Sequence, residues 1–216
     1  MNKTIKACQD VVATGLAMFN SNLVVGTWGN ISTRVTEEEV MALTPSGMDY
    51  NELQPSDIVL VDFQGKIVGG NRRPSSELPL HLAIYQGRKD VNAIVHTHSI
   101  YASALAAARK PIPAAVEDLV QIVGGDVRVS KYVLPGTAEL GTAAVQAMEG
   151  RNAVLLANHG VVGVGRDLRE ALRVCQIVEK AAQITIMASL LGGVVELSSE
   201  DIAAMRNFYL HGYGQQ

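Results

Sequence analysis

The sequence predicts a layered α/β fold built on a largely antiparallel or mixed sheet. Its 216 residues suit one compact domain, and no linker, repeat or low-complexity tract divides the chain, so we expect residues 1–216 to form a single domain. Apolar residues make up 48% of the chain and charged residues 18%, which allows a large core and excludes wholesale disorder. The strand patterns outnumber those that a strict strand–helix alternation requires, and helical patterns bracket them, which favours antiparallel pairing.

The first half of the chain carries one long helical pattern followed mostly by strands. Between residues 3 and 20, apolar side chains recur near a 3.6-residue period, which predicts a helix. Short apolar runs then predict strands, and Gly65 marks a hairpin turn between two of them. The full predicted order is a helix at 3–20, strands at 27–35, 40–43, 58–63 and 66–69, a helix at 77–87, a strand at 91–98 and an Ala-rich helix at 99–108.

The second half of the chain is predicted to contain three helices with recognisable N-terminal caps. Thr137 suits the N-cap of the first of them. Asp167, with Glu170 three residues later, resembles a capping box at the start of the longest helix, and Ser198 caps the last one. The predicted order is an irregular stretch opened by Pro111 and Pro113, short strands near 127–134, a helix at 137–148, strands at 153–157 and 161–164, a helix at 168–191 and a final helix after Ser198.

Charge and composition exclude several classes of partner. The formal net charge is only −3 at pH 7, which gives no electrostatic reason to expect a nucleic-acid partner or binding to an anionic membrane. Every apolar stretch is interrupted short of about 18 residues, and the N-terminus is too polar for a secretory signal, so we expect a soluble protein. Its two cysteines, Cys8 and Cys175, do not make a disulfide framework, and the cytoplasm is the simplest location.

Three of the five histidines lie at the ends of predicted apolar strands. His96 and His98 are two residues apart, and residues at i and i+2 of a strand project from the same face, so both imidazoles can converge on one ion. His159 ends a second strand and precedes Gly160, which lets the chain turn tightly. Three histidines form a usual ligand set of catalytic zinc, with the fourth position open. Two histidines on a strand are also often ordinary surface or core residues, so the residues alone leave both interpretations open.

Hydroxyl groups and glycines of the kind that bind phosphate occur in three further segments. Ser75 and Ser76 precede a predicted helix, whose first N–H groups and dipole favour an anion, and Glu77 lies in its first turn. The alternative is that a serine is only an N-cap and that Glu77 only compensates the helix dipole. The turns Gly29-Asn30 and Thr44-Pro45-Ser46-Gly47 suggest a phosphate cradle only in company with another hydroxyl-rich loop. The chain has no P-loop and no complete Gly-x-Gly-x-x-Gly pattern, so a nucleotide fold is not supported.

Taken together, five ordered motifs resemble the class II aldolase/adducin family over essentially the whole chain. Within that family, the chain most resembles the sugar-phosphate aldolases of the L-fuculose-1-phosphate type. The motifs are Gly29-Asn30-Ile31-Ser32, Thr44-Pro45-Ser46-Gly47, Pro74-Ser75-Ser76-Glu77, His96-Thr97-His98 and Asn158-His159-Gly160. The resemblance implies a three-layer αβα sandwich around a mainly antiparallel (mixed) central sheet. It also implies a homotetramer with active sites at the subunit interfaces.

The family resemblance further implies roles for individual residues. The ligands of one Zn²⁺ per subunit would be His96, His98 and His159. Glu77 would be the acid/base residue and could serve as a fourth ligand, and a catalytic tyrosine of the family's C-terminal tail corresponds to Tyr213. The phosphate of the substrate would be bound by Gly29, Asn30, Ser46, Gly47, Ser75 and Ser76.

One position departs from the family pattern. Aldolases of the L-fuculose-1-phosphate type have a second catalytic tyrosine shortly after an Ile-Pro-Ala segment. In this chain, Ile112-Pro113-Ala114 leads instead to Glu117-Asp118. Methylthioribulose-1-phosphate dehydratase has a glutamate that acts as acid/base at about this place, but it lacks the Ser-Ser-Glu found here at 75–77. We therefore include Glu117 among the expected catalytic residues.

The activity that this resemblance implies is that of a lyase of carbohydrate metabolism. It would cleave a ketose 1-phosphate into dihydroxyacetone phosphate and an aldehyde through a metal-stabilised enediolate. Glu77 would transfer the proton at C3, and Glu117 or Tyr213 would handle the proton of the C4 hydroxyl. The alternatives are the dehydratase, a ribulose-phosphate 4-epimerase, whose Thr-His-Ala-Asp stretch is absent, and a decarboxylase, some of which have Lys in place of Ser76. Adducin-like interaction modules lack the metal histidines, which argues against a non-enzymatic role.

Overall fold

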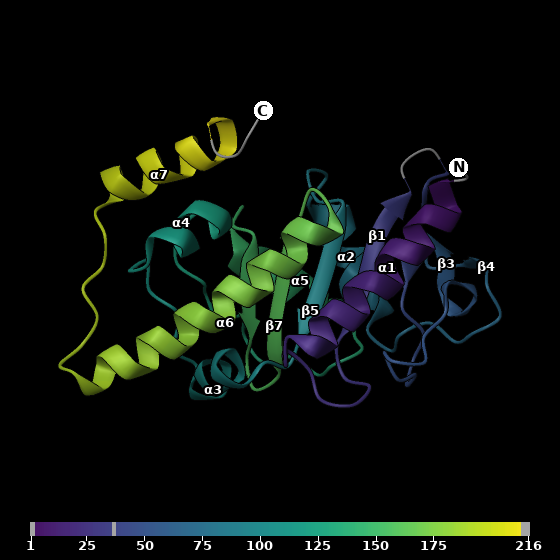
Figure 1. Cartoon of the computed structure of the whole chain (residues 1–216), viewed down its shortest axis with the longest axis horizontal. Helices are drawn as coiled ribbons and strands as arrows, with labels where there is room; N and C mark the ends of the chain where they lie inside the picture. The colour runs from purple at the N-terminus through teal and green to yellow at the C-terminus, as the bar shows by residue number, and fades with distance from the viewer. Residues whose placement is uncertain (1–2, 36–37, 213–216) are drawn as a thin grey trace.

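A seven-stranded sheet with helices on both faces forms the centre of the computed structural model, which describes residues 3–35 and 38–212 (Figure 1). The strand order is β4-β3-β2-β1-β5-β7-β6, and every strand pairing in these residues is antiparallel. The strands are β1 (Asn30–Val35), β2 (Val40–Leu43), β3 (Val59–Asp62), β4 (Ile67–Gly69), β5 (Ala93–Thr97), β6 (Ala153–Leu156) and β7 (Gly160–Gly165).

The helices divide between the two faces and one edge of this sheet. The face that carries α1 and α6 is the nearer one in Figure 1, and α2 and α5 cover the opposite face, while α3 and α4 lie at the β6 edge. The helices are α1 (Lys3–Asn20), α2 (Leu78–Gly87), α3 (Ile100–Ala108), α4 (Glu117–Val123), α5 (Ala138–Met148), α6 (Leu168–Leu190) and α7 (Ser199–His211). This arrangement confirms the predicted α/β sandwich.

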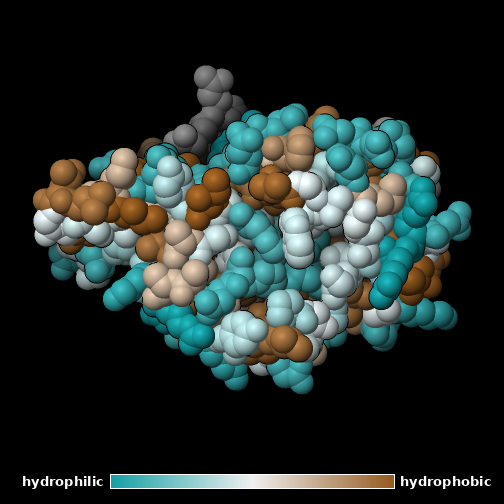
Figure 2. All heavy atoms as spheres, turned by 90° about the horizontal axis from the view of Figure 1, so that it is seen from below, coloured by the Kyte–Doolittle hydropathy of each residue, from teal (hydrophilic) through white to brown (hydrophobic). Residues whose placement is uncertain are grey.

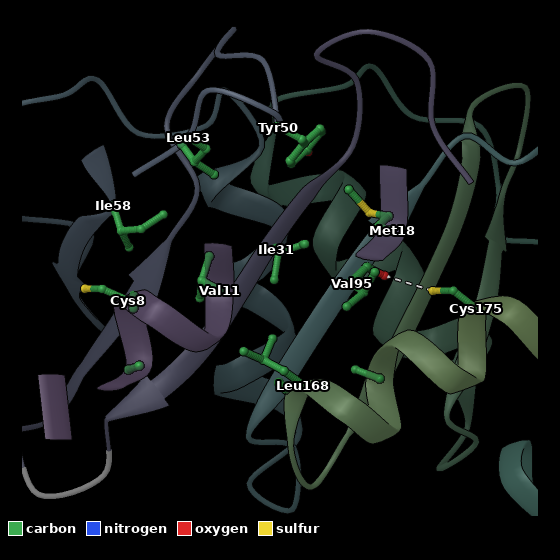
Figure 3. Close-up of a cluster of buried hydrophobic side chains, with 14 of the residues drawn as sticks. Cys8, Val11, Met18, Ile31, Tyr50, Leu53, Ile58, Val95, Leu168 and Cys175 are labelled. Atoms are coloured by element: carbon green, nitrogen blue, oxygen red, sulfur yellow. Dashed lines mark hydrogen bonds between the residues drawn. The ribbon is translucent and has the colours of Figure 1, made fainter. Parts of the chain in front are cut away.

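Alternation along the strands creates a separate apolar core on each face. Ile31 and Val95 point toward α1 and α6, where they pack with Val11 and Cys175 (Figure 3). The Cys175 thiol donates a hydrogen bond of 3.4 Å to the Val95 carbonyl oxygen, and both cysteines are unpaired and buried. Ile94, one residue before Val95, belongs to the core under α2 and α5. Every residue of β5 is buried, and neighbouring strand residues alternate between faces, so the position of a residue along the strand fixes whether its side chain meets α2.

The helix caps are as predicted, with one difference. Thr137 and Ser198 accept hydrogen bonds from backbone N–H groups three residues later, at 3.3 and 3.1 Å. Asp167 likewise accepts from the Glu170 N–H at 2.7 Å. The Glu170 carboxylate, however, accepts from the Arg166 backbone N–H at 2.7 Å instead of completing the capping box, because it also pairs with the Arg166 guanidinium at 3.0 Å.

The region between α3 and α5 differs from the sequence prediction. The strands predicted near 127–134 are wrong, since Val127 and Val129 form only isolated bridges, to Ile112 and to Leu155. Alternating valines made this segment resemble a strand although it is extended beside β6 without joining a ladder. The helix α4 was not predicted, because its seven residues are too few to show a clear helical period.

Strand register brings three distant segments to one end of the sheet. Asn30 of β1 and Val162 of β7 both lie opposite His96 of β5, on either side of it. The loop before α2 reaches the same end, where Pro45 and Pro74 form a bridge. Among the described helices, none is long and apolar enough to cross a membrane.

Candidate functional site

Four side chains with metal-binding atoms meet at the end of β5. One potential ligand atom from each of Glu77, His96, His98 and His159 lies within 4.8 Å of the other three. The Nε2 atoms of His96 and His98 are 2.9 Å apart, and the Glu77 carboxylate oxygens lie 3.0 Å from His96 Nε2 and 3.4 Å from His159 Nε2. The structure therefore brings together all four residues that the sequence predicts as a metal site.

Backbone constraints aim these imidazoles at one point. His96 Nδ1 donates to the Val161 carbonyl oxygen at 3.0 Å, so its Nε2 carries the lone pair and faces the cluster. Gly160 lies so close to β5 that a Cβ atom on it would be 2.3 Å from the Thr97 carbonyl oxygen. Only glycine fits there, and the tight approach places His159 beside His96, with ring centroids 4.8 Å apart.

The electrostatics of the cluster favour neutral imidazoles at His98 and His159 and an ionised carboxylate at Glu77. Burial and the neighbouring imidazoles lower the pKa of His98 to about 3 and that of His159 to about 4, so both are neutral at pH 7. Burial alone would raise the pKa of Glu77, but His96, His159 and a hydrogen bond from Asn30 outweigh it and hold that pKa well below its ordinary value. The same carboxylate raises the pKa of His96 against the lowering effect of burial.

This donor set fits a divalent cation. Neutral imidazole nitrogens and one carboxylate oxygen are the ligands typical of zinc. The Oε1 atom of Glu77 is buried and has no hydrogen-bond partner among the described residues, although an ionised oxygen normally has one. Two imidazole Nε2 atoms at 2.9 Å also repel unless a proton or a cation lies between them. The residues present are therefore suited to hold a metal ion.

The cluster opens into a cavity of about 310 Å³. Glu77, His98 and His159 line it, as do all six residues predicted to bind phosphate: Gly29, Asn30, Ser46, Gly47, Ser75 and Ser76. The two glycines among them, Gly29 and Gly47, have positive φ angles of 79° and 71°, a backbone conformation that glycine adopts without steric cost.

The Glu77 side chain is not used as a helix cap. Glu77 occupies the N-cap position of α2, but its carboxylate makes no capping hydrogen bond and turns into the cluster instead. Its backbone N–H donates to the Ser75 hydroxyl at 3.2 Å. The carboxylate oxygen Oε2 accepts a hydrogen bond of 2.8 Å from the Asn30 side-chain amide. These contacts favour a functional role for Glu77 over the alternative of dipole compensation alone.

Sequence reasoning missed three residues of the cavity wall, Thr27, Trp28 and Pro135, of which Trp28 is the largest. Trp28 precedes the Gly29-Asn30 turn, lines the cavity and remains 65% exposed. The centroid of its ring lies 5.5 Å from that of the His98 ring, and the two ring planes are inclined at 32°. The only signal in the sequence is that the single tryptophan stands directly before a motif with predicted function.

Of the two remaining predicted catalytic residues, one lies away from this cavity and the other lies outside the described residues. Glu117 is exposed at the start of α4 and is not among the described residues that line the cavity, and Tyr213 lies outside the described residues. The last turns of α7 lie beside the start of α6, where Tyr209 contacts Glu170 at 3.3 Å. That is the sheet end opposite the histidines, because β5 begins opposite Gly165, the last residue of β7.

Comparison with known proteins gives the family. Residues 9–186 match the profile of the Class II Aldolase and Adducin N-terminal domain. The chain belongs to this family. It is 39% identical over 211 residues, 98% of each chain, to 5-deoxy-D-ribulose 1-phosphate aldolase of Bacillus thuringiensis serovar kurstaki. It is 34% identical to L-fuculose phosphate aldolase of Escherichia coli K12, over 93% of this chain and 92% of the other.

The fold agrees with that assignment. A solved structure of an L-fuculose 1-phosphate aldolase superposes with a TM-score of 0.92 at 41% identity, over 95% of this chain and 96% of the other. Membership of the family, the full-length relatives and the histidine–glutamate cluster make this protein a metal-dependent aldolase.

We predict that the purified protein carries one divalent metal ion per chain. Replacing His96, His98 or His159 by Ala should each lower the metal content markedly, because each removes one of the converging ligands. Elemental analysis by mass spectrometry measures the stoichiometry, and His211→Ala on α7 is the matched control with unchanged content. Full metal content in all three variants would contradict the assignment.

Proposed function

We propose that this protein is a zinc-dependent aldolase that cleaves a ketose 1-phosphate into dihydroxyacetone phosphate and an aldehyde. The observation that supports it best is that the metal-binding cluster and two hydroxyl-rich loops line the same cavity. The buried, unpaired cysteines agree with a cytoplasmic location.

The two loops form one wall, suited to the phosphate group. Ser46 N–H donates to the Arg73 carbonyl oxygen at 2.9 Å, and Ser75 N–H donates to the Thr44 carbonyl oxygen at 3.1 Å. These bonds hold the hydroxyl groups of both loops at the N-terminus of α2, where the helix dipole favours an anion. Binding energy from the phosphate would then fix the reacting carbons beside the cluster.

The metal would be held by His96, His98 and His159, with Glu77 as an alternative fourth ligand. When bound, Zn²⁺ supplies Lewis-acid stabilisation of negative charge on substrate oxygens, which removes the need for a Schiff-base lysine.

Glu77 is suited to move the proton at C3 of the substrate. Its lowered pKa keeps it ionised at neutral pH, so it can accept a proton. Asn30 holds one carboxylate oxygen, and the other has no hydrogen-bond partner among the described residues. In the cleavage direction, Glu77 would first take up a proton from solvent and then donate it to C3.

We propose a homotetramer in which the remaining proton transfer, at the C4 hydroxyl, uses Glu117 or Tyr213 of a neighbouring copy. Exposed apolar side chains gather at the end of the molecule where α6 finishes (Figure 2). They include Leu191 and Val195, which are 88% and 87% exposed. A patch of this kind normally marks an interface.

The two relatives suggest that the sugar ends in a methyl group, since both 5-deoxyribulose and fuculose do. Trp28 offers an apolar surface beside His98, where the end of the sugar remote from the phosphate can lie. We propose that Trp28 favours such deoxy sugars over their hydroxylated counterparts.

Replacing Glu77 by Gln should slow exchange of the C3 hydrogen of dihydroxyacetone phosphate with deuterated water by about 100-fold or more, because the variant keeps the shape but loses the base. Proton NMR without aldehyde isolates this step from carbon–carbon cleavage. Affinity for the phosphate should be retained, and metal content is checked in parallel. If exchange in the metal-replete variant matched the wild type, the base would lie elsewhere, with Glu117 the next candidate, and the dehydratase alternative would gain support.

Light scattering should show four copies per particle, and Leu191→Asp should dissociate them and reduce turnover, since a charge is costly in an apolar interface. Val68→Asp on β4, also at an exposed apolar position, is the control and should leave the assembly intact. A fully active wild-type monomer would contradict the shared-site proposal.

Trp28→Ala should lower kcat/KM for 5-deoxyribulose 1-phosphate about 10-fold relative to ribulose 1-phosphate, because lost apolar contact affects only the methyl-ended sugar. Trp28→Phe, which retains most of the apolar surface, is the control. Equal losses for both sugars would assign Trp28 to general packing instead.

A further inference from the structure

We propose that His81 is a positioning residue that fixes the Asn30 amide and, through it, the Glu77 carboxylate. The proposal rests on the proposed role of Glu77 in proton transfer. His81 lies one helical turn beyond Glu77 on α2, and its side chain is fully buried.

An unbroken series of hydrogen bonds leads from Tyr85 to the carboxylate. Tyr85 Oη lies 2.9 Å from Ser32 Oγ, which lies 2.6 Å from His81 Nδ1. On the other side of the ring, His81 Nε2 is 2.6 Å from Asn30 Oδ1, and Asn30 Nδ2 is 2.8 Å from Glu77 Oε2.

Regular geometry produces this series. Glu77, His81 and Tyr85 are four residues apart, so they lie on one face of α2. Asn30 and Ser32 are two apart on β1, so they project from the same face of the sheet. The two sets interdigitate, with the strand residues between the helix residues.

The chemistry of the groups allows one direction for these hydrogen bonds. The ionised Glu77 oxygen only accepts, so Asn30 Nδ2 donates to it and Asn30 Oδ1 must accept. His81 Nε2 is therefore the donor to Asn30, which leaves Nδ1 of the neutral ring to accept from the Ser32 hydroxyl. Burial keeps the ring neutral, because it lowers the pKa of His81 to about 3.

This fixed direction gives His81 a function that packing alone does not require. A side chain without a donor at this place would free the Asn30 amide to rotate. The amide could then turn away from the Glu77 carboxylate, and the hydrogen bond that holds Oε2 would be weakened. The side-chain hydrogen bonds of His81 go to Ser32 and Asn30 and not to the seryl hydroxyls of the phosphate wall, so substrate binding should be largely unaffected.

The test compares His81→Leu, which removes donor and acceptor, with His81→Gln, which offers an N–H and a carbonyl oxygen in similar places. The measured quantities are the kcat and KM of C3 hydrogen exchange on dihydroxyacetone phosphate, metal content and melting temperature. For His81→Leu we expect kcat to fall about 10- to 100-fold with KM within about 3-fold and metal content unchanged, as is usual for residues that orient an active group. His81→Gln should recover most of the lost kcat.

The controls separate positioning from folding and from the role of Glu77. A lower melting temperature with unchanged kcat in His81→Leu would overturn the proposal. If His81→Leu does not fold, Asn30→Asp, which places an oxygen where the amide donor stands, should show the same loss of kcat, and an unchanged kcat would again overturn it. If exchange is lost in Glu77→Gln but not in these variants, only the positioning role of His81 is rejected. Normal exchange in Glu77→Gln would instead reject the proposed role of Glu77 in proton transfer.

Discussion

The Glu77 carboxylate lies buried among imidazoles, and much of the structure around it serves to keep it ionised there. An isolated carboxylate in a protein interior is strongly disfavoured unless it is paired and hydrogen-bonded. Here three elements supply partners: β5 brings His96, the turn into β7 brings His159, and β1 brings the Asn30 amide. The pairing of β1, β5 and β7 as neighbouring antiparallel strands is therefore a condition of the site as well as of the fold.

Much of the fold could be predicted because its signals are local. The period of α1 and the capping residues Asp167 and Ser198 depend only on neighbours in the sequence. The strands predicted near 127–134 were wrong because their valines alternate as in a strand, yet backbone pairing there is limited to single bridges. Whether such a segment joins a sheet depends on the edge that folding leaves open to it, and a local pattern does not contain that information.

The candidate site was predictable to the extent that its residues form short motifs. His96 and His98 share a strand face, and Ser75, Ser76 and Glu77 share a helix start, so spacing marked them as candidates. Their roles followed only from the resemblance of the combined motifs to the family. The Asn30 amide was expected at the phosphate, but in the structure both of its ends are engaged, with Glu77 and His81. That contact depends on how α2 packs across β1, some fifty residues away in the chain, and no motif records it.

The close approach of Gly160 to β5 also limits how this protein can change. A side chain at position 160 would collide with the Thr97 backbone, which cannot move without displacing His96 and His98 on either side. Trp28, by contrast, stands largely free at the rim of the same cavity. We therefore expect position 160, beneath the metal-binding cluster, to tolerate almost no substitution, and position 28, where we propose that the far end of the substrate lies, to tolerate many. New substrate preferences can then arise in the lineage, or in a directed-evolution library, while the chemistry stays fixed.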